Sequence, residues 1–201
     1  MSKDKKVRWA ILGAGKIANK FAQDFKVIQN GELVAVASSD KERAMAFAAQ
    51  YQIPFSYSYD ELYDSENVDA VYIATTHNFH YEQTLACLQH GKAVLCEKPI
   101  TVNDVQFKKL ADLAKEKKLF LMEAMWTYFL PAMQKAKAWI NEGRIGNIKA
   151  IQADFGFKME YNPSGRLYNI ALAGGALLDL GIYPIAFAAF FMNRQPQSIT
   201  A

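Results

Sequence analysis

The chain has 201 residues, of which 51% are hydrophobic and 21% are charged. This composition is typical of a folded globular protein and excludes a disordered or fibrous one. Its 23 lysines and arginines exceed its 20 aspartates and glutamates by only three, which is too small an excess to predict nucleic-acid binding. Cys87 and Cys96 are the only cysteines and form no Cys-x-x-Cys pair. We therefore expect no disulfide framework, no metal site and a reducing, cytoplasmic location.

The N-terminal sequence MSKDKK leads into a short apolar run that lacks the features of a signal peptide, so we expect no secretory leader. One stretch, Ile170–Met192, is apolar enough to be mistaken for a membrane span. Because it contains paired glycines, Asp179 and Pro184, we interpret it as a buried helix, with a membrane anchor as the alternative. We therefore expect no membrane partner.

Short apolar runs recur along the first part of the chain and predict buried parallel strands. In chain order they are Val7–Leu12, Glu32–Ala37, Val68–Ala74, Ala93–Cys96 and Leu119–Met122. Between them the apolar residues recur at helical spacing. The predicted helices begin at Lys16, at the capping-box pattern Ser39-Asp40-Lys41-Glu42, before Leu85, and near Asn103. Strands that alternate with helices are typical of right-handed βαβ units, so we predict a doubly wound parallel α/β sheet.

The pattern then changes to that of a second domain. It predicts an amphipathic helix at Pro131–Glu142, a strand at Asn147–Phe157, and a helix rich in glycine and alanine at Gly174–Phe191. A single strand cannot form an independent sheet. We therefore expect an incomplete α+β domain, either cut off or with a missing part that was never in this chain. We place the two domains at residues 1–123 and 124–201.

A glycine-rich turn separates the first predicted strand from the first predicted helix. Its sequence, Gly13-Ala14-Gly15-Lys16-Ile17-Ala18, has the pattern G-x-G-x-x-A. The first glycine permits a tight turn, the second lets the backbone approach a pyrophosphate, and the small Ala18 lets the helix pack on the strand. The helix N-terminus then offers free amides to phosphates. This placement favours dinucleotide binding over a purely structural turn.

The end of the second strand carries hydroxyl groups and cations. Where an acid would bind the adenosine ribose of NAD, the chain has Ser38 and Ser39, followed by Asp40, Lys41 and Arg43. Hydroxyl groups with nearby cations can bind the 2′-phosphate of NADP. The alternative is that Ser39 only caps the helix and that both cations face water. We expect NADP as the cofactor, with NAD as the alternative because of Asp40.

The tripeptide Glu97-Lys98-Pro99 follows the strand Ala93–Cys96 directly. Ligands of open α/β sheets bind at the carboxyl ends of the strands, and a proline at position 99 keeps Lys98 out of helical geometry. We therefore interpret Lys98 as a functional ammonium group, with an ordinary surface lysine as the alternative.

Near the end of the chain, the sequence GGALLDLGIYP contains Asp179 and Tyr183 four residues apart. On a helix these two side chains share one face. An aspartate flanked by leucines is costly to bury unless it has a hydrogen-bonding or charged partner, or a functional role. A helix-capping or packing carboxylate is the alternative to a functional role.

Together these motifs resemble the Gfo/Idh/MocA family of NAD(P)-dependent oxidoreductases. The resemblance rests on GAGKIA, on VDAVYIATTHNFHYEQTLACLQHGKAVLCEKPIT and on GGALLDLGIYP, and it extends over essentially the whole chain. Tyr183, where many members have histidine, is similar to the branch that contains dihydrodiol dehydrogenases and glucose-fructose oxidoreductase. The resemblance implies a Rossmann domain followed by a substrate and dimerisation domain, most of whose sheet is absent from this chain.

The resemblance also implies roles for individual residues. Lys98 would lie beside the nicotinamide and the reacting hydroxyl, with Glu97 helping to position it, while Tyr183 would act as general acid/base and Asp179 would orient the substrate end. The candidate catalytic residues are thus Lys98, Tyr183 and Asp179. The candidate cofactor-binding residues are Gly13, Gly15, Lys16, Ile17, Ser38, Ser39, Lys41, Arg43, Thr75, His77, His80, Glu97 and Lys98.

The histidines His77 and His80 have a spacing that could serve a metal, but no third ligand accompanies them. We expect His77 to line the cofactor pocket and His80 to begin the next helix.

The sequence therefore predicts an enzyme that moves hydride between NADP, or NAD, and a secondary alcohol of a sugar, polyol or cyclic diol. We expect the full-length form to be a homo-oligomer. The alternative is a non-catalytic NAD(P)-binding regulator on the same fold, because a fold does not determine function. The presence of Lys98, Asp179 and Tyr183 together favours the enzyme.

Overall fold

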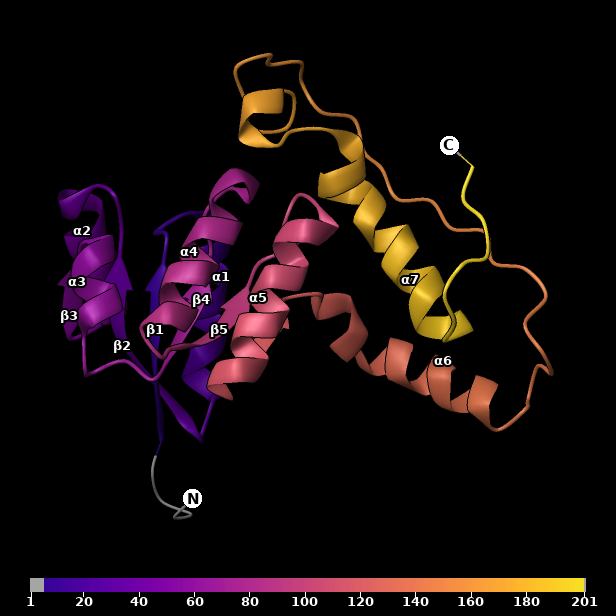
Figure 1. Ribbon diagram of the computed structural model, residues 1–201, viewed down its shortest axis with the longest axis horizontal. Helices are drawn as coiled ribbons and strands as arrows, with labels where there is room; N and C mark the ends of the chain where they lie inside the picture. Colours follow the sequence, from indigo (N-terminus) through magenta and orange to yellow (C-terminus); the bar gives the residue numbers. More distant parts are fainter. Residues whose placement is uncertain (1–5, 201) are drawn as a thin grey trace. The chain divides into compact units, whose positions relative to one another are not determined.

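A six-stranded parallel sheet forms the first part of the computed structural model, which describes residues 6–200 (Figure 1). Its strands are β1 (Val7–Leu12), β2 (Gly31–Ala37), β3 (Phe55–Tyr57), β4 (Ala70–Ile73), β5 (Ala93–Cys96) and β6 (Leu121–Glu123). They lie side by side in the order β3-β2-β1-β4-β5-β6, and every pairing is parallel. This order confirms the predicted doubly wound sheet. Successive strands are added in one direction from β1 to β3 and in the other from β4 to β6, and dinucleotides bind at this switch point between β1 and β4.

Both faces of this sheet are covered by helices, which is why its strands read as continuous apolar runs. The helices are α1 (Lys16–Asp24), α2 (Lys41–Tyr51), α3 (Tyr59–Asp64), α4 (His77–Gln89) and α5 (Asp104–Lys117), with a short 3₁₀ turn η1 (Phe25–Val27) after α1. Buried residues of α3, α4 and α5 join one core cluster, and those of α1 and α2 join the other. The side chains of β1, β4 and β5 alternate between the two clusters.

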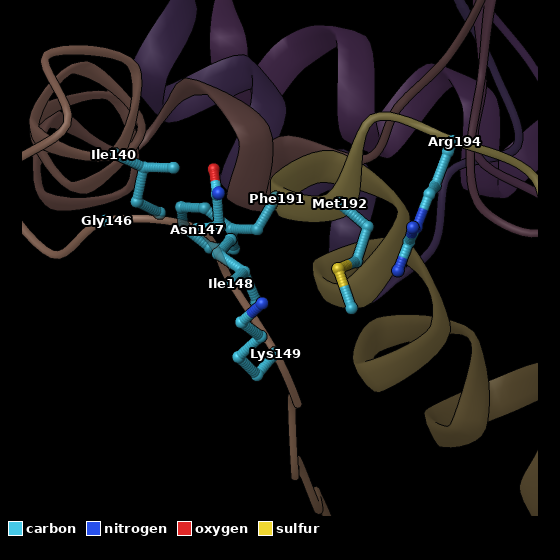
Figure 2. A pocket seen from close by; sticks show the side chains of 8 residues that line it. All are labelled: Ile140, Gly146, Asn147, Ile148, Lys149, Phe191, Met192 and Arg194. Atoms are coloured by element: carbon cyan, nitrogen blue, oxygen red, sulfur yellow. The ribbon is translucent and has the colours of Figure 1, made fainter.

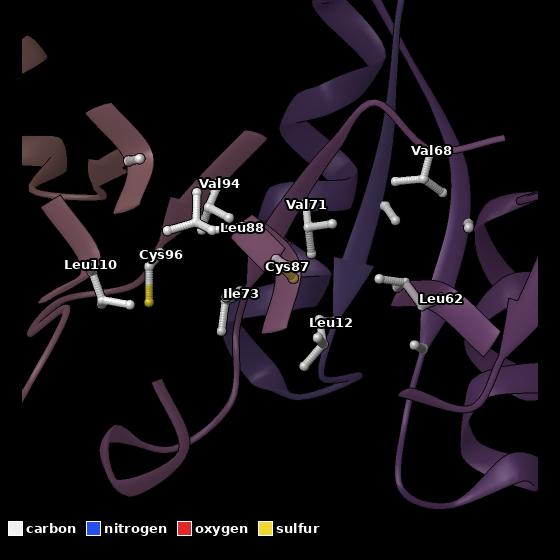
Figure 3. Packing of buried hydrophobic residues seen from close by; sticks show 14 of the residues in the cluster. Leu12, Leu62, Val68, Val71, Ile73, Cys87, Leu88, Val94, Cys96 and Leu110 are labelled. Carbon is white, nitrogen blue, oxygen red and sulfur yellow. The ribbon is translucent and has the colours of Figure 1, made fainter. Parts of the chain in front are cut away.

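Figure 3 shows side chains of the larger core cluster. Leu12 of β1 and Ile73 of β4 contribute to it, whereas their neighbours Ile11 and Tyr72 belong to the cluster on the opposite face. Cys87 and Cys96 lie buried in the larger cluster as free thiols. Burial raises the pKa of Cys87 to about 12, so this thiol is an inert packing group.

Two short elements in this part of the chain escaped prediction. β3 has three residues and α3 has six, so neither shows a full period of apolar residues. The capping box lies at α3, where Ser58 accepts the Glu61 N–H and Glu61 accepts the Ser58 N–H. The predicted capping box at Ser39 is wrong, because α2 is capped by Asp40, whose carboxylate accepts the Arg43 N–H at 3.1 Å.

The chain divides into two compact units, Met1–Ala124 and Met125–Ala201. The described part of the second unit contains η2 (Trp126–Phe129), α6 (Pro131–Asn141), η3 (Ile170–Leu172), a π-helical turn η4 (Leu177–Gly181) and α7 (Ile182–Met192). The strand predicted at Asn147–Phe157 is not formed in this structure. An alternating sequence becomes a strand only when its backbone groups find a partner strand, and the described residues of this unit supply none.

Judged by length and composition alone, the segment Ile170–Met192 could cross a membrane. A single such segment is weak evidence for a span, but the prediction of a buried helix is wrong for this structure, because only 6% of its most apolar window is buried. Its backbone is not one regular helix, because Ala173 and Gly175 take φ values of 56° and 126°. Asp179 within it pairs with Arg166 at 3.0 Å. The predicted helix therefore begins after Gly175 and includes the π-helical turn.

Candidate active site

The glycine turn after β1 is fixed by close backbone packing. Gly13 has a φ of +103°, and a Cβ there would lie 2.8 Å from the Thr75 Cγ2 atom and 3.0 Å from the Ala74 carbonyl carbon. Only glycine fits this conformation and this space. Gly15 is different, because a Cβ there would meet nothing closer than the Ala74 oxygen at 3.8 Å. Space therefore remains beside Gly15, as the approach of a pyrophosphate requires.

The helix that follows the turn begins without a side-chain cap. Gly15 is the N-cap residue of α1, and no side chain accepts a hydrogen bond from the first turn. Unpaired amides and the positive end of the helix dipole attract phosphate. Lys16 and Ile17 are exposed at this end of α1. The residues predicted to bind a pyrophosphate therefore provide both the space and the positive electrostatic potential that this group requires.

At the end of β2, the hydroxyl of Ser38 accepts the Asp40 N–H at 3.2 Å, and Ser38 is buried. The carboxylate of Asp40 turns toward α2, where it caps the helix and lies 4.0 Å from the Arg43 guanidinium. Ser39 and Lys41 are exposed. The acid that favoured NAD in the sequence is thus engaged with its own helix, while one serine and two cations remain at the surface.

The loop after β4 packs against the glycine turn through Thr75. Its hydroxyl donates to Gln83 at 2.6 Å, and its methyl group faces Gly13. His77 is the first residue of α4 and is 8% exposed. Helix α4 therefore begins at His77 and not at His80.

His80 lies behind this loop and has no exposed surface. Its ring nitrogens lie 2.7 Å from the Pro99 oxygen and 3.2 Å from the Thr75 oxygen. Burial lowers the pKa of His80 while both carbonyl contacts oppose this, and a neutral imidazole donates to only one of them at a time. This placement argues against the predicted direct contact of His80 with the cofactor. His80 instead connects the loop after β4 with the loop after β5 through its contacts with Thr75 and Pro99.

The loop after β5 carries Glu97 and Lys98 at the same edge of the sheet. The Glu97 N–H donates to the Ile73 oxygen at 3.0 Å, and the Ile100 N–H donates to the Glu123 carboxylate at 2.8 Å. Both Glu97 and Lys98 are half-buried, and the peptide bond between Lys98 and the following proline is cis. The loop is thus anchored on β4 and β6, and Lys98 lies between those anchors.

In the second unit, Asp179 lies in the π-helical turn η4 and has 14% of its side chain exposed. Its partner is Arg166, whose guanidinium lies 3.0 Å from the carboxylate. The loop that carries Arg166 packs so closely that a Cβ at Gly174 would lie 2.8 Å from the Arg166 oxygen. The sequence indicated that Asp179 needs a partner, and the structure identifies it. Short π-helical segments are frequent at functional sites.

Tyr183 lies among aromatic side chains that sequence reasoning missed. Its hydroxyl accepts a hydrogen bond from the Trp126 indole N–H at 3.1 Å. The ring of Phe155 packs edge-on against Tyr183 with 5.1 Å between centroids. Trp126 and Phe155 are 54% and 51% exposed, so the aromatic faces around the Tyr183 hydroxyl are accessible from solvent. No spacing in the sequence connects these three residues, which come from η2, a segment without regular secondary structure and α7.

An open pocket of about 490 Å³ lies elsewhere in the second unit, and Figure 2 shows the eight residues that line it. They are Ile140, Gly146, Asn147, Ile148, Lys149, Phe191, Met192 and Arg194. None of them is a predicted site residue. The chemistry-bearing residues instead lie at the carboxyl edge of the sheet and around Tyr183.

Residues 7–125 match the oxidoreductase family GFO_IDH_MocA with its NAD-binding Rossmann fold, and residues 133–201 match the C-terminal domain of the same family. The chain belongs to the Gfo/Idh/MocA oxidoreductase family. This confirms the resemblance inferred from the three motifs. It also identifies the glycine turn and the uncapped α1 as parts of an NAD(P)-binding domain.

The chain is 42% identical over 199 residues to the trans-1,2-dihydrobenzene-1,2-diol dehydrogenase of Mus musculus. It is 38% identical over 198 residues to the Homo sapiens protein of the same name. These matches cover 97% and 96% of this chain and 59% of each relative. The chain therefore spans less than two thirds of the length of the curated relatives that it matches.

Two solved structures show the same architecture. An aldose-aldose oxidoreductase from Caulobacter crescentus has a TM-score of 0.88 at 29% identity, covering 96% of this chain and 59% of that protein. A 3-ketoreductase from Actinomadura kijaniata in complex with NADP has a TM-score of 0.84 at 31% identity, covering 94% of this chain and 58% of that protein. The predicted fold class, including an incomplete second domain, is thereby confirmed.

Proposed function

We propose that the protein transfers hydride between NADP and a secondary alcohol of a cyclic diol, polyol or sugar. The observation that carries this proposal is the joint presence of an NAD(P)-binding sheet edge, an anchored Lys98, and a Tyr183 hydroxyl set in an exposed aromatic surface. Aromatic faces beside hydrogen-bonding groups suit a ring that carries hydroxyls. The relatives' names, which include a diol dehydrogenase and an aldose oxidoreductase, agree with this substrate class.

The nicotinamide, when bound, supplies the hydride acceptor or donor, and the protein supplies position and charge. Oxidation of an alcohol requires that its hydroxyl proton leave as the hydride departs, so a group that exchanges protons must contact that oxygen. We assign this role to Tyr183 and electrostatic stabilisation of the oxygen to Lys98. Asp179, held by Arg166, orients the substrate end. Gly13, Gly15 and the first turn of α1 hold the pyrophosphate.

A screen by absorbance at 340 nm tests the activity. The 201-residue chain is assayed with NADP and a panel of trans-dihydrodiols, polyols and aldoses. In parallel, the same chain is assayed after fusion to the remaining C-terminal part of the mouse relative. We expect turnover of at least one diol or sugar by the fusion, and cofactor binding with little turnover by the chain alone. NADP binding without turnover of any of these compounds would instead favour the non-catalytic regulator.

Preference for NADP over NAD is a separate prediction. Exposed Ser39, Lys41 and Arg43 can bind a 2′-phosphate, while Asp40 is engaged at the α2 N-terminus. We expect calorimetry to show about tenfold or more tighter binding of NADP, near 1.4 kcal/mol. The preference should shrink as salt rises, because exposed charges are screened. In Lys41→Gln/Arg43→Gln we expect it to disappear, with NAD affinity unchanged as the control. Equal affinity of the unaltered chain for both cofactors contradicts this role.

A further inference from the structure

We propose that Tyr72 is a positioning residue for Lys98 and that it acts through the carboxyl group of Glu97. The inference rests on the proposed function, since it assigns Tyr72 to the machinery of the same reaction. It concerns a side chain of the sheet that is 3% exposed.

The Glu97 carboxyl joins Tyr72 to Lys98. The Tyr72 hydroxyl donates to Oε1 of Glu97 at 2.5 Å, and Oε2 of Glu97 accepts the Lys98 N–H at 3.3 Å. Both oxygens of one side chain are thus committed, one to a buried strand and one to the backbone of the residue that carries the ammonium group. Fixing both oxygens restricts the rotation of Glu97 and with it the backbone at Lys98.

The position of the Tyr72 hydroxyl is itself fixed. Tyr72 lies in the central strand β4 and is 3% exposed. Its ring stacks on Phe21 of α1 with 3.9 Å between centroids and 12° between planes. Because α1 begins at the glycine turn, the same helix presents its N-terminus to phosphate and holds the ring that orients Glu97. A phenol in the core needs a hydrogen-bond partner, and Glu97 is that partner.

The charges around Glu97 give this hydrogen bond a chemical consequence. Burial raises the pKa of Glu97, and Glu123 adds to this, whereas the Tyr72 hydroxyl and Lys98 oppose it. Burial also raises the pKa of Tyr72, so its hydroxyl stays a donor at neutral pH. Donation to the carboxylate favours the ionised form. Tyr72 therefore opposes the effect of burial on the pKa of Glu97, in favour of the carboxylate beside Lys98, as well as holding the side chain in place.

The test is Tyr72→Phe, which keeps the ring and its stacking on Phe21 but removes the hydroxyl. In the 201-residue chain with ¹³C-labelled glutamate, we expect the Glu97 carboxyl to titrate about 1 to 2 pH units higher than in the unaltered protein. Tyr63→Phe is the matched control. It removes the hydroxyl of a half-buried tyrosine in α3 and should leave the Glu97 titration unchanged.

The second measurement is enzyme activity, in whichever of the two proteins, the 201-residue chain or its fusion, turns over substrate. We expect kcat of Tyr72→Phe to fall by about tenfold, with KM for NADP little changed, because the groups that bind phosphate are untouched. The acidic limb of its pH profile should move to higher pH, since Glu97 takes up a proton earlier. In a Glu97→Gln background, Tyr72→Phe should have little further effect, because the two act as one unit.

The outcomes separate this inference from the proposed function. An unchanged Glu97 titration in folded Tyr72→Phe overturns the inference whatever the activity. So does a raised titration with unaltered kcat and pH profile, since Tyr72 would then not act on Lys98. Failure of the proposed function would show differently, as a full-length fusion inactive on every diol and sugar.

Discussion

Gly15→Val is expected to abolish cofactor binding while the protein stays folded. A Cβ at Gly15 would lie 3.8 Å from the Ala74 oxygen, and the φ of −98° is accessible to valine. The branched side chain would occupy the space through which a pyrophosphate approaches the α1 N-terminus. We expect NADP affinity to fall about 100-fold or more, near 2.8 kcal/mol, as measured by quenching of intrinsic tryptophan fluorescence.

Gly13→Ala is the matched control, in which we expect the main effect on stability and not on the approach of the cofactor. Its φ of +103° and the 2.8 Å contact with Thr75 mean that a methyl group strains the backbone and collides with the loop after β4. We expect a lower melting temperature, corresponding to about 1 to 3 kcal/mol. Gly15→Val should lower the melting temperature less, by the cost of a poorer N-cap residue alone. Normal NADP affinity in folded Gly15→Val would show that the phosphates bind elsewhere.

The sequence allowed the sheet to be predicted because its strands are buried on both faces and its helices are regular. The predicted strand Ala93–Cys96 is β5 to the residue, and Val7–Leu12 is β1. Chain order then places Gly13, Thr75 and Lys98 at one edge, because all parallel strands end there. Local patterns were less decisive where two adjacent residues could serve as a cap, as at Ser39 and Asp40.

What could not be predicted depends on contacts between distant residues. Trp126 and Tyr183 are 57 positions apart, and Tyr72 and Glu97 are 25 apart. No periodicity relates the two residues of either pair. Only the folded chain shows that the Trp126 indole donates a hydrogen bond to Tyr183 and that the Tyr72 hydroxyl donates one to Glu97. The segment Asn147–Phe157 is the opposite case, since its alternation is local but a strand requires a partner that the described residues do not provide.

The last prediction concerns Tyr183 and Lys98 as one catalytic unit. Tyr183→Phe keeps the ring against Phe155 but removes the hydroxyl that accepts the Trp126 N–H. If this hydroxyl exchanges the substrate proton, kcat should fall by about 10² to 10⁴. Tyr161→Phe, at a residue 72% exposed, is the matched control and should keep full activity.

Lys98→Met keeps the length of the side chain and removes its charge, and it should also lower kcat. Because both groups act on the same substrate oxygen, the double variant should be little worse than the more damaging single one, whereas independent groups would multiply their losses. Steady-state kinetics of the active fusion with the best substrate of the screen measures this. Near-normal turnover by Tyr183→Phe would remove Tyr183 from the mechanism and leave Lys98, or a residue outside this chain, as the proton carrier.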